Sequence, residues 1–288
     1  MNPFDVFLIN PILNLLVVIY KILEAAAIPG ALGLAIILLT TIIRMAIWPL
    51  TASQLKSTQK MAALKPHLER IRTDHGHDKV RHQQEVARLY KEHGVNPLAG
   101  CLPLLLQMPL FIALYNVLLK IVAFEKADFL TSINAKLYSP SLYLDQIPET
   151  SFLGFNLAAK PSQWQQAGLL ILLVPILTGV FQFIQSKMLA PASPAKRGEP
   201  ASTNQNLKLQ SSSEPAGKDQ KQGLEDSMAQ VQSQMILIMP AMIAFFSYGF
   251  PLGLSLYWNT FTIIGIIQQY VITGPGSLAK YLPEKWRK

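Results

Sequence analysis

Long apolar segments alternate with polar ones along this chain. The first long, predominantly apolar segment covers residues 29–52, which is long enough for a helix that crosses the hydrocarbon core of a bilayer, since such a helix takes about 20 residues. Further apolar segments cover residues 97–123, 164–190, 228–248 and 252–273. The pattern predicts an all-α membrane protein with five transmembrane helices.

The stretch before the first span, residues 1–28, holds the apolar run "ILNLLVVIY", which is too short to cross a bilayer. We expect this stretch to form an amphipathic helix on the outer membrane surface. A secretory signal peptide is the alternative reading, but such a peptide begins with basic residues. The first twenty residues contain no Lys or Arg.

Residues 53–96 are polar and hold nine Lys or Arg, five Asp or Glu and all five His. Two sets of apolar residues recur there at helical spacing: Leu64, Leu68 and Ile71, then Val86, Leu89 and Tyr90. The segment "DHGHD" between the two sets is typical of a turn. This pattern predicts a helical hairpin in the cytoplasm.

Three further segments are polar or mixed. Residues 124–163 form a predicted extracytoplasmic loop, and residues 274–288 a basic cytoplasmic tail. Residues 191–227 are rich in Pro, Ser, Ala and Gln, a composition that cannot bury a core, so they are expected to form a disordered cytoplasmic linker.

Composition and charge agree with a membrane protein and orient it. Charged residues make up 15% of the chain, against about 25% in soluble domains. The predicted hairpin, linker and tail are richer in Lys and Arg than the segments on the other side of the spans. Because cytoplasmic loops carry such an excess, we expect the N-terminus outside and the C-terminus in the cytoplasm.

Arg44 lies inside the first span, where a charge costs roughly 2.5–3.5 kcal/mol at the centre of a helix. No Asp or Glu is available to neutralise it in residues 98–122, 164–191 or 228–281. The side chain could extend to the interface, but it lies well before the cytoplasmic end of the span. We therefore expect it to face a water-filled cavity.

Polar residues on other spans have the spacing of helix faces. Thr41, Arg44 and Trp48 share one face, and Trp48 is placed to stack on the guanidinium. The other candidates are Gln107, then Thr178, Gln182 and Gln185, then Ser255, Asn259, Thr262 and Gln269 with Trp258 beside them. Such faces should meet each other or water. In the alternative interpretation these residues only hold helices together.

Residues for catalysis, metal binding or cofactor binding are not indicated. The chain has a single cysteine, Cys101, and its histidines are scattered over polar helices without the pairing of a metal motif. Neither a nucleophile elbow nor a phosphate-binding glycine loop is present. We expect no enzyme, no metal and no cofactor.

Three segments resemble the YidC/Oxa/Alb family of membrane protein insertases: "GLAIILLTTIIRMAIWPLTASQLKSTQKMAALKPHLERIR", "LYKEHGVNPLAGCLPLLLQMPLFIALYNVL" and "MPAMIAFFSYGFPLGLSLYWNTFTIIGIIQQYVI". The resemblance implies a five-span core with an intramembrane hydrophilic groove that is closed towards the outside. Arg44 in "IIR" and Trp258 in "LYW" match groove positions, as does one glutamine of "FQFIQSKM", either Gln182 or Gln185. The large extracytoplasmic domain of Gram-negative members is not expected here.

The resemblance also implies a function without hydrolysis, the insertion of nascent membrane proteins. The expected partners are these substrates, membrane lipid and the Sec translocon, with the ribosome and the signal recognition particle receptor as further candidates and no DNA. The expected location is a bacterial cytoplasmic (inner) membrane, or a thylakoid membrane if the source is cyanobacterial. An anion-selective transporter or channel is the alternative, and a purely structural assembly factor is a third hypothesis.

Overall fold

The fold is described from a computed structural model. It covers residues 3, 5–95, 108–109, 111–113, 115–117, 126–189 and 238–284. Apart from one two-stranded hairpin, the regular structure of these residues is helical, which confirms the expected all-α class. The predicted linker at 191–227 and most of the predicted span at 97–123, including Gln107, lie outside the described residues.

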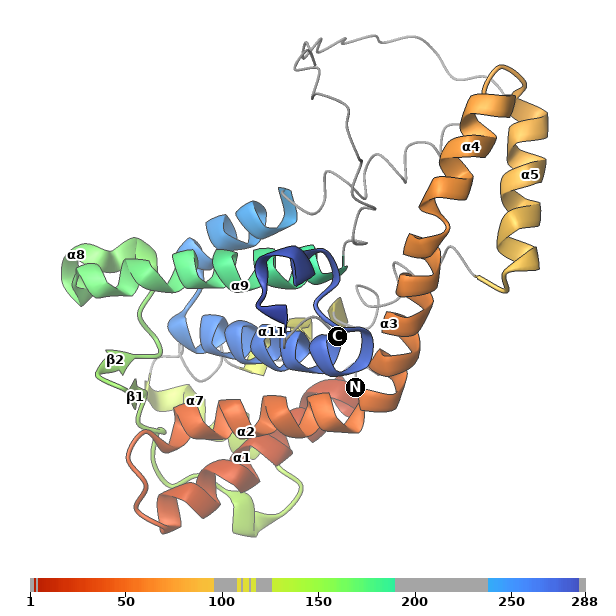
Figure 1. Cartoon of the computed structure of the whole chain (residues 1–288). Coiled ribbons are helices and arrows are strands. Elements are labelled where there is room, and N and C mark those ends of the chain that lie inside the picture. Colours follow the sequence, from red (N-terminus) through yellow and green to blue (C-terminus); the bar gives the residue numbers. More distant parts are fainter. Residues whose placement is uncertain are drawn as a thin grey trace, which may run out of the picture.

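Four long helices form the body of the molecule. They are α1 (Asn10–Ala25), which continues the π-helical turn η1 (Asp5–Ile9), α2 (Ala31–Ala46), α9 (Leu173–Leu189) and α11 (Leu252–Thr273). They lie side by side with α2 between α1 and α11, and α11 between α2 and α9 (Figure 1). The order in space therefore brings the C-terminal helix against the first predicted span.

The helices pack through one hydrophobic core and leave another apolar surface uncovered. Core residues include Leu13 and Leu16 of α1, Ile36 of α2 and Tyr257 of α11. Large apolar side chains on α9 and on the helix Ile238–Gly249 remain exposed, among them Leu173, Ile176, Val180, Met242 and Phe245. Exposed apolar side chains of this kind are suited to contact with lipid.

Two described helices are long and apolar enough to cross a membrane by length and composition, Asp5–Ala25 and Leu169–Leu189. A third crossing results if the bent pair of α2 and α3 is one span. The N-terminal apolar run was expected to be too short to cross a bilayer, but it lies in a 21-residue helix that is long and apolar enough to do so by length and composition. The count of five spans and the outer surface position of this helix stay predictions.

The chain bends by 64° between α2 and α3 (Trp48–Ala63). Pro49 stands in the first turn of α3, where it has no N–H to donate to the preceding turn. The single face expected to carry Thr41, Arg44 and Trp48 is therefore interrupted after Arg44. Trp48 opens the next helix instead.

Beyond the bend, α3 leads into α4 (Lys65–His75), and α5 (Lys79–Glu92) runs back beside α4 (Figure 1). A small separate core holds this pair, formed by Leu64, Leu89 and Val95 with Met61, Leu68, Ile71 and Tyr90 packed against it. Asp78 caps α5 by accepting a hydrogen bond from the Arg81 backbone N–H at 3.1 Å.

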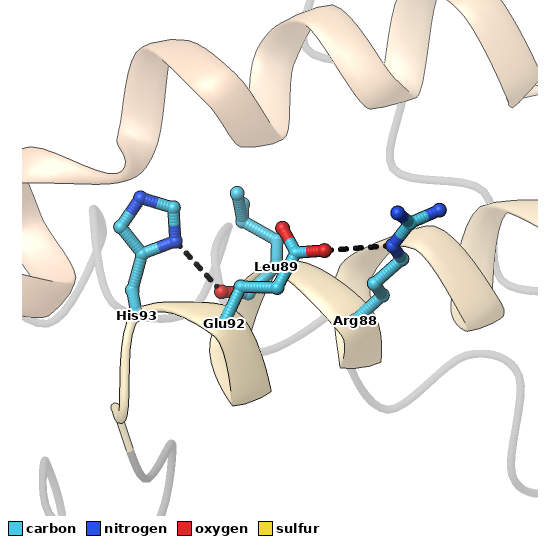
Figure 2. A network of polar contacts seen from close by, with 4 residues as sticks. All are labelled: Arg88, Leu89, Glu92 and His93. Carbon is cyan, nitrogen blue, oxygen red and sulfur yellow. Dashed lines mark hydrogen bonds and ion pairs between the residues drawn. The ribbon is translucent and has the colours of Figure 1, made fainter.

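Residues near the end of α5 form a network of polar contacts (Figure 2). Arg88 Nε lies 2.7 Å from Glu92 Oε1, and His93 Nδ1 lies 2.9 Å from the Leu89 carbonyl oxygen. The hydrogen bond to Glu92 raises the pKa of Arg88. An exposed pair of this kind contributes little to stability, so the apolar contacts account for the packing of α5 on α4.

Residues 126–172 fold into short elements against one end of the helices. These are α7 (Lys126–Asn134), η3 (Pro140–Leu142), β1 (Ser151–Phe152), β2 (Phe155–Asn156), η4 (Pro161–Gln163), α8 (Trp164–Ala167) and η5 (Leu169–Leu172). The strands pair antiparallel, with Ser151 opposite Asn156. The predicted extracytoplasmic loop is thus ordered.

Side chains and backbone groups attach this loop to three helices. The buried Asn14 donates to the Lys136 carbonyl at 3.0 Å and accepts from the Tyr138 N–H at 2.8 Å. Near the start of α11, the N–H groups of Leu252 and Gly253 donate to carbonyls of the loop at 2.9 Å. Phe152 packs against α2 at Gly33. The loop therefore covers the ends of α1, α2 and α11.

Candidate functional site around Arg44

Arg44 lies in the last turn of α2 and is only 5% exposed. Its Nη1 donates to Gln268 Oε1 at 3.1 Å, and its Nη2 donates to the Phe261 carbonyl at 2.9 Å. The Arg44 Cζ lies 3.4 Å from the centroid of the Phe261 ring, a cation–π distance. Both partners belong to α11, so one helix supplies all of these contacts.

The partners of Arg44 are neutral. Arg88–Glu92 on α5 is the one ion pair among the described residues. Arg44 Nε is buried and has no hydrogen-bond partner among these residues. Two hydrogen bonds from a guanidinium that carries five N–H donors leave it incompletely satisfied. The guanidinium therefore retains capacity to bind an acceptor.

Three residues of α11 make room for Arg44 and hold it. Phe261, Gly265 and Gln268 are spaced by four and three, so they share one helix face. A Cβ added at Gly265 would lie 2.5 Å from Arg44 Nη2 and 2.5 Å from Gln185 Nε2. The missing side chain at Gly265 thus lets both polar groups approach the backbone of α11.

One prediction about Arg44 needs correction. The ring that stacks on the guanidinium is Phe261 and not Trp48, because the bend after Arg44 takes Trp48 onto α3. The glutamine that contacts Arg44 is Gln268, which was not among the candidate residues. The spacing of ring, glycine and amide on one face of α11 is the signal that could have found Gln268.

Other candidate residues meet along the contact between α9 and α11. Trp258 Nε1 donates to Gln182 Oε1 at 3.3 Å, and the Trp258 ring stands edge-on to Phe111 at 5.2 Å between centroids. Asn259 Oδ1 is buried without a partner among the described residues. Gln182 thus contacts Trp258, whereas Gln185 lies beside Gly265.

The Thr41 hydroxyl donates to the Ile37 carbonyl of its own helix at 2.8 Å. Nearer the loop, three buried hydroxyls lie together. Ser247 Oγ is 3.5 Å from Thr178 Oγ1 and 3.1 Å from Ser255 Oγ. These contacts join α9, the helix Ile238–Gly249 and α11. Thr178 and Ser255 were expected on polar faces, whereas Ser247 was not.

The described residues contain no group of three or more His, Cys, Asp or Glu that could hold a metal ion. The polar contacts described above use neutral amides, hydroxyls and one guanidinium. These groups can bind a hydrogen-bond acceptor or an anion. Together, the helices, the exposed apolar surface and these internal polar contacts define a helical membrane protein.

Comparison with known proteins gives the family. The family model for "60Kd inner membrane protein" matches residues 24–277, and the chain belongs to this family. The expected YidC-type family is thereby confirmed.

Curated relatives carry insertase names. The chain is 30% identical over 265 residues to the membrane protein insertase YidC of Chlamydia trachomatis, covering 92% of this chain and 28% of that protein. It is 29% identical over 267 residues to YidC of Nitratidesulfovibrio vulgaris, covering 92% and 38%. It is 30% identical over 257 residues to the membrane protein insertase MisCA of Bacillus subtilis, covering 88% and 74%. The chain thus spans about a third of the length of these YidC relatives and most of MisCA.

Proposed function

We propose that the chain is a membrane protein insertase, which moves nascent membrane proteins from the cytoplasm into a bacterial inner membrane. The observation that carries the proposal is Arg44, a buried cation whose described partners are neutral, at the contact between α2 and α11. Relatives named as membrane protein insertases support the same assignment.

The proposed mechanism uses the charge of Arg44 and the free energy of lipid burial. An acidic outer segment of the substrate is attracted to the guanidinium, since charge-assisted hydrogen bonds are about twice as strong as neutral ones. The following apolar segment of about 20 residues then partitions into lipid, which favours transfer without hydrolysis. The protein lowers the barrier by offering polar contacts within the membrane.

We assign the lining of this path to polar residues around Arg44. The proposed lining residues are Thr41, Trp48, Gln107, Gln182, Gln185, Trp258 and Asn259. The contact of Gln182 with Trp258 and the approach of Gln185 to Gly265 support their inclusion. The proposed topology has five spans, the N-terminus outside and the hairpin of α4 and α5 in the cytoplasm. There the hairpin meets substrates delivered by the ribosome or the signal recognition particle receptor, and the protein works alone or with the Sec translocon.

Arg44→Ala tests the electrostatic step in reconstituted liposomes. Two single-span substrates are compared that differ only in Asp or Asn residues in the outer tail, and insertion is measured by protease protection. Loss of a charge-assisted bond of about 1.5–3 kcal/mol predicts insertion of the Asp substrate about tenfold to a hundredfold slower. The Asn substrate should change little, and Arg44→Lys should retain part of the activity. Insertion of the Asp substrate by Arg44→Ala at the parental rate would refute this step.

A buried lone cation is also what an anion-selective transporter or channel would use. The same liposomes distinguish the two functions, since this alternative requires an anion flux that depends on Arg44. The proposed insertase predicts no such flux at protein densities that support insertion.

A further inference from the structure

Arg44 occupies a docked position on α11 that covers its guanidinium. The side chain is 5% exposed, with Nη1 and Nη2 bonded to Gln268 and Phe261 and the ring of Phe261 beneath Cζ. A substrate carboxylate approaching this conformation would find the guanidinium already covered. Recognition therefore requires Arg44 to leave α11 at least in part.

Gln268 contacts Arg44 at two points. Its Oε1 accepts from Arg44 Nη1 at 3.1 Å, and its Nε2 donates to the Arg44 backbone carbonyl at 3.2 Å. The Gln268 side chain is fully buried. Arg44 stands in the last turn of α2, where the Ile47 N–H donates to the carbonyls of Ile43 and Met45 rather than to that of Arg44. One carboxamide thus fixes both the end of α2 and its charged side chain.

We propose that Gln268 is a positioning residue, which holds Arg44 docked on α11 until a carboxylate of the substrate draws the guanidinium away. The docking stands on the contacts above, whereas the role of the carboxylate rests on the proposed insertase function. A neutral carboxamide suits this task because its hydrogen bonds are weaker than those of a carboxylate, so an acidic substrate can displace it. A carboxylate at position 268 would instead form a permanent internal ion pair.

The docked position is tested by the reactivity of Arg44 towards phenylglyoxal, an arginine reagent, in the full chain reconstituted in liposomes. Peptide mass spectrometry measures the modification rate, with the exposed Arg88 as an internal reference. Gln268→Met keeps the length of the side chain but removes both hydrogen bonds, so Arg44 should react at least about fivefold faster. Gln268→Glu should react no faster than the parent.

Gln269→Met is the matched control, because Gln269 is also buried on α11 and has no hydrogen bond to Arg44. Arg44 reactivity should stay at the parental rate in this variant. An unchanged rate in Gln268→Met, or an equal rise in Gln269→Met, would overturn the proposal. If Gln268→Met does not fold, Gln268→Glu tests the proposal instead. Faster modification of Arg44 in Gln268→Glu than in the parent would contradict docking, and slower or equal modification would support it.

The second measurement is insertion of the paired Asp and Asn substrates. Gln268→Glu should slow insertion of the Asp substrate at least about tenfold, because the internal ion pair competes with the substrate. Unimpaired Asp insertion by Gln268→Glu would contradict the displacement. The two proposals fail separately. Normal insertion by Arg44→Ala refutes the electrostatic function and leaves the phenylglyoxal result standing, whereas an unprotected Arg44 refutes docking whatever the insertion rates.

Discussion

Because Gly265 has no side chain, Arg44 can approach the backbone of α11 closely. A methyl group there would lie 2.5 Å from both Arg44 Nη2 and Gln185 Nε2. Both are the ends of flexible side chains, which can move at little cost. Alanine also favours the helix by roughly 0.5–1 kcal/mol relative to glycine.

We therefore predict that Gly265→Ala keeps the thermal stability of the protein but displaces Arg44 from its docked position. Arg44 should react several-fold faster with phenylglyoxal, while the melting temperature in detergent stays within a few degrees of the parent. Gly249→Ala is the control, since a Cβ there meets no atom within 4 Å. A large drop in melting temperature with an unchanged Arg44 would show that the methyl group is accommodated elsewhere.

The sequence allowed us to predict that the partners of Arg44 are neutral, but not which residues they are. The absence of acidic residues from the apolar segments is visible in one dimension, and the described partners of Arg44 are indeed neutral. The identity of these partners depends on how α11 is rotated against α2. Adjacent glutamines such as Gln268 and Gln269 point about 100° apart on a helix, so a small error in that rotation exchanges them.

At the scale of elements, apolar runs predict helices better than they predict how helices end or bend. The first span was expected over residues 29–52, but α2 ends at Ala46 and the 64° bend makes α3 a separate helix. The ordered structure of residues 126–163 was not predicted, because its short elements depend on distant contacts such as those of Asn14 with Lys136 and Tyr138. Such contacts leave no periodic signal in the loop itself.

Substitution of Gly33 tests how tightly the loop that contains Phe152 packs against α2. A Cβ at this position would overlap Cγ, Cδ2 and Cβ of Phe152, and the root of an aromatic side chain cannot move without shifting β1. Overpacking of this kind costs about 1–3 kcal/mol, which exceeds the gain from alanine in a helix.

Gly33→Ala should therefore lower the melting temperature of the protein in detergent micelles by several degrees. Gly253→Ala is the matched control, because a Cβ there would lie at an ordinary 3.5 Å from the Leu157 carbonyl oxygen at another helix end covered by the loop. If both variants have the melting temperature of the parent, the packing of Phe152 on α2 is not a tight contact in solution.

At the scale of the whole molecule, α9 and the helix Ile238–Gly249 are joined in space although the intervening chain is long. Ser247 bonds to Thr178, and a Cβ at Gly179 would lie 2.9 Å from Ala244 Cβ. We therefore expect the packing between these helices not to depend on the composition of residues 191–227.

Deletion of residues 195–222 tests this independence. The deleted segment lies within the predicted disordered linker, and the remaining connection still spans tens of ångströms when extended at about 3.3 Å per residue. We expect the shortened protein to insert both paired substrates at rates within about twofold of the parent. Deletion of residues 139–142, which includes the Ser141 carbonyl bonded to Lys21, is the contrasting variant and should destabilise the ordered loop. Complete loss of insertion on removing 195–222, with an unchanged melting temperature, would assign a function to the linker that its composition does not predict.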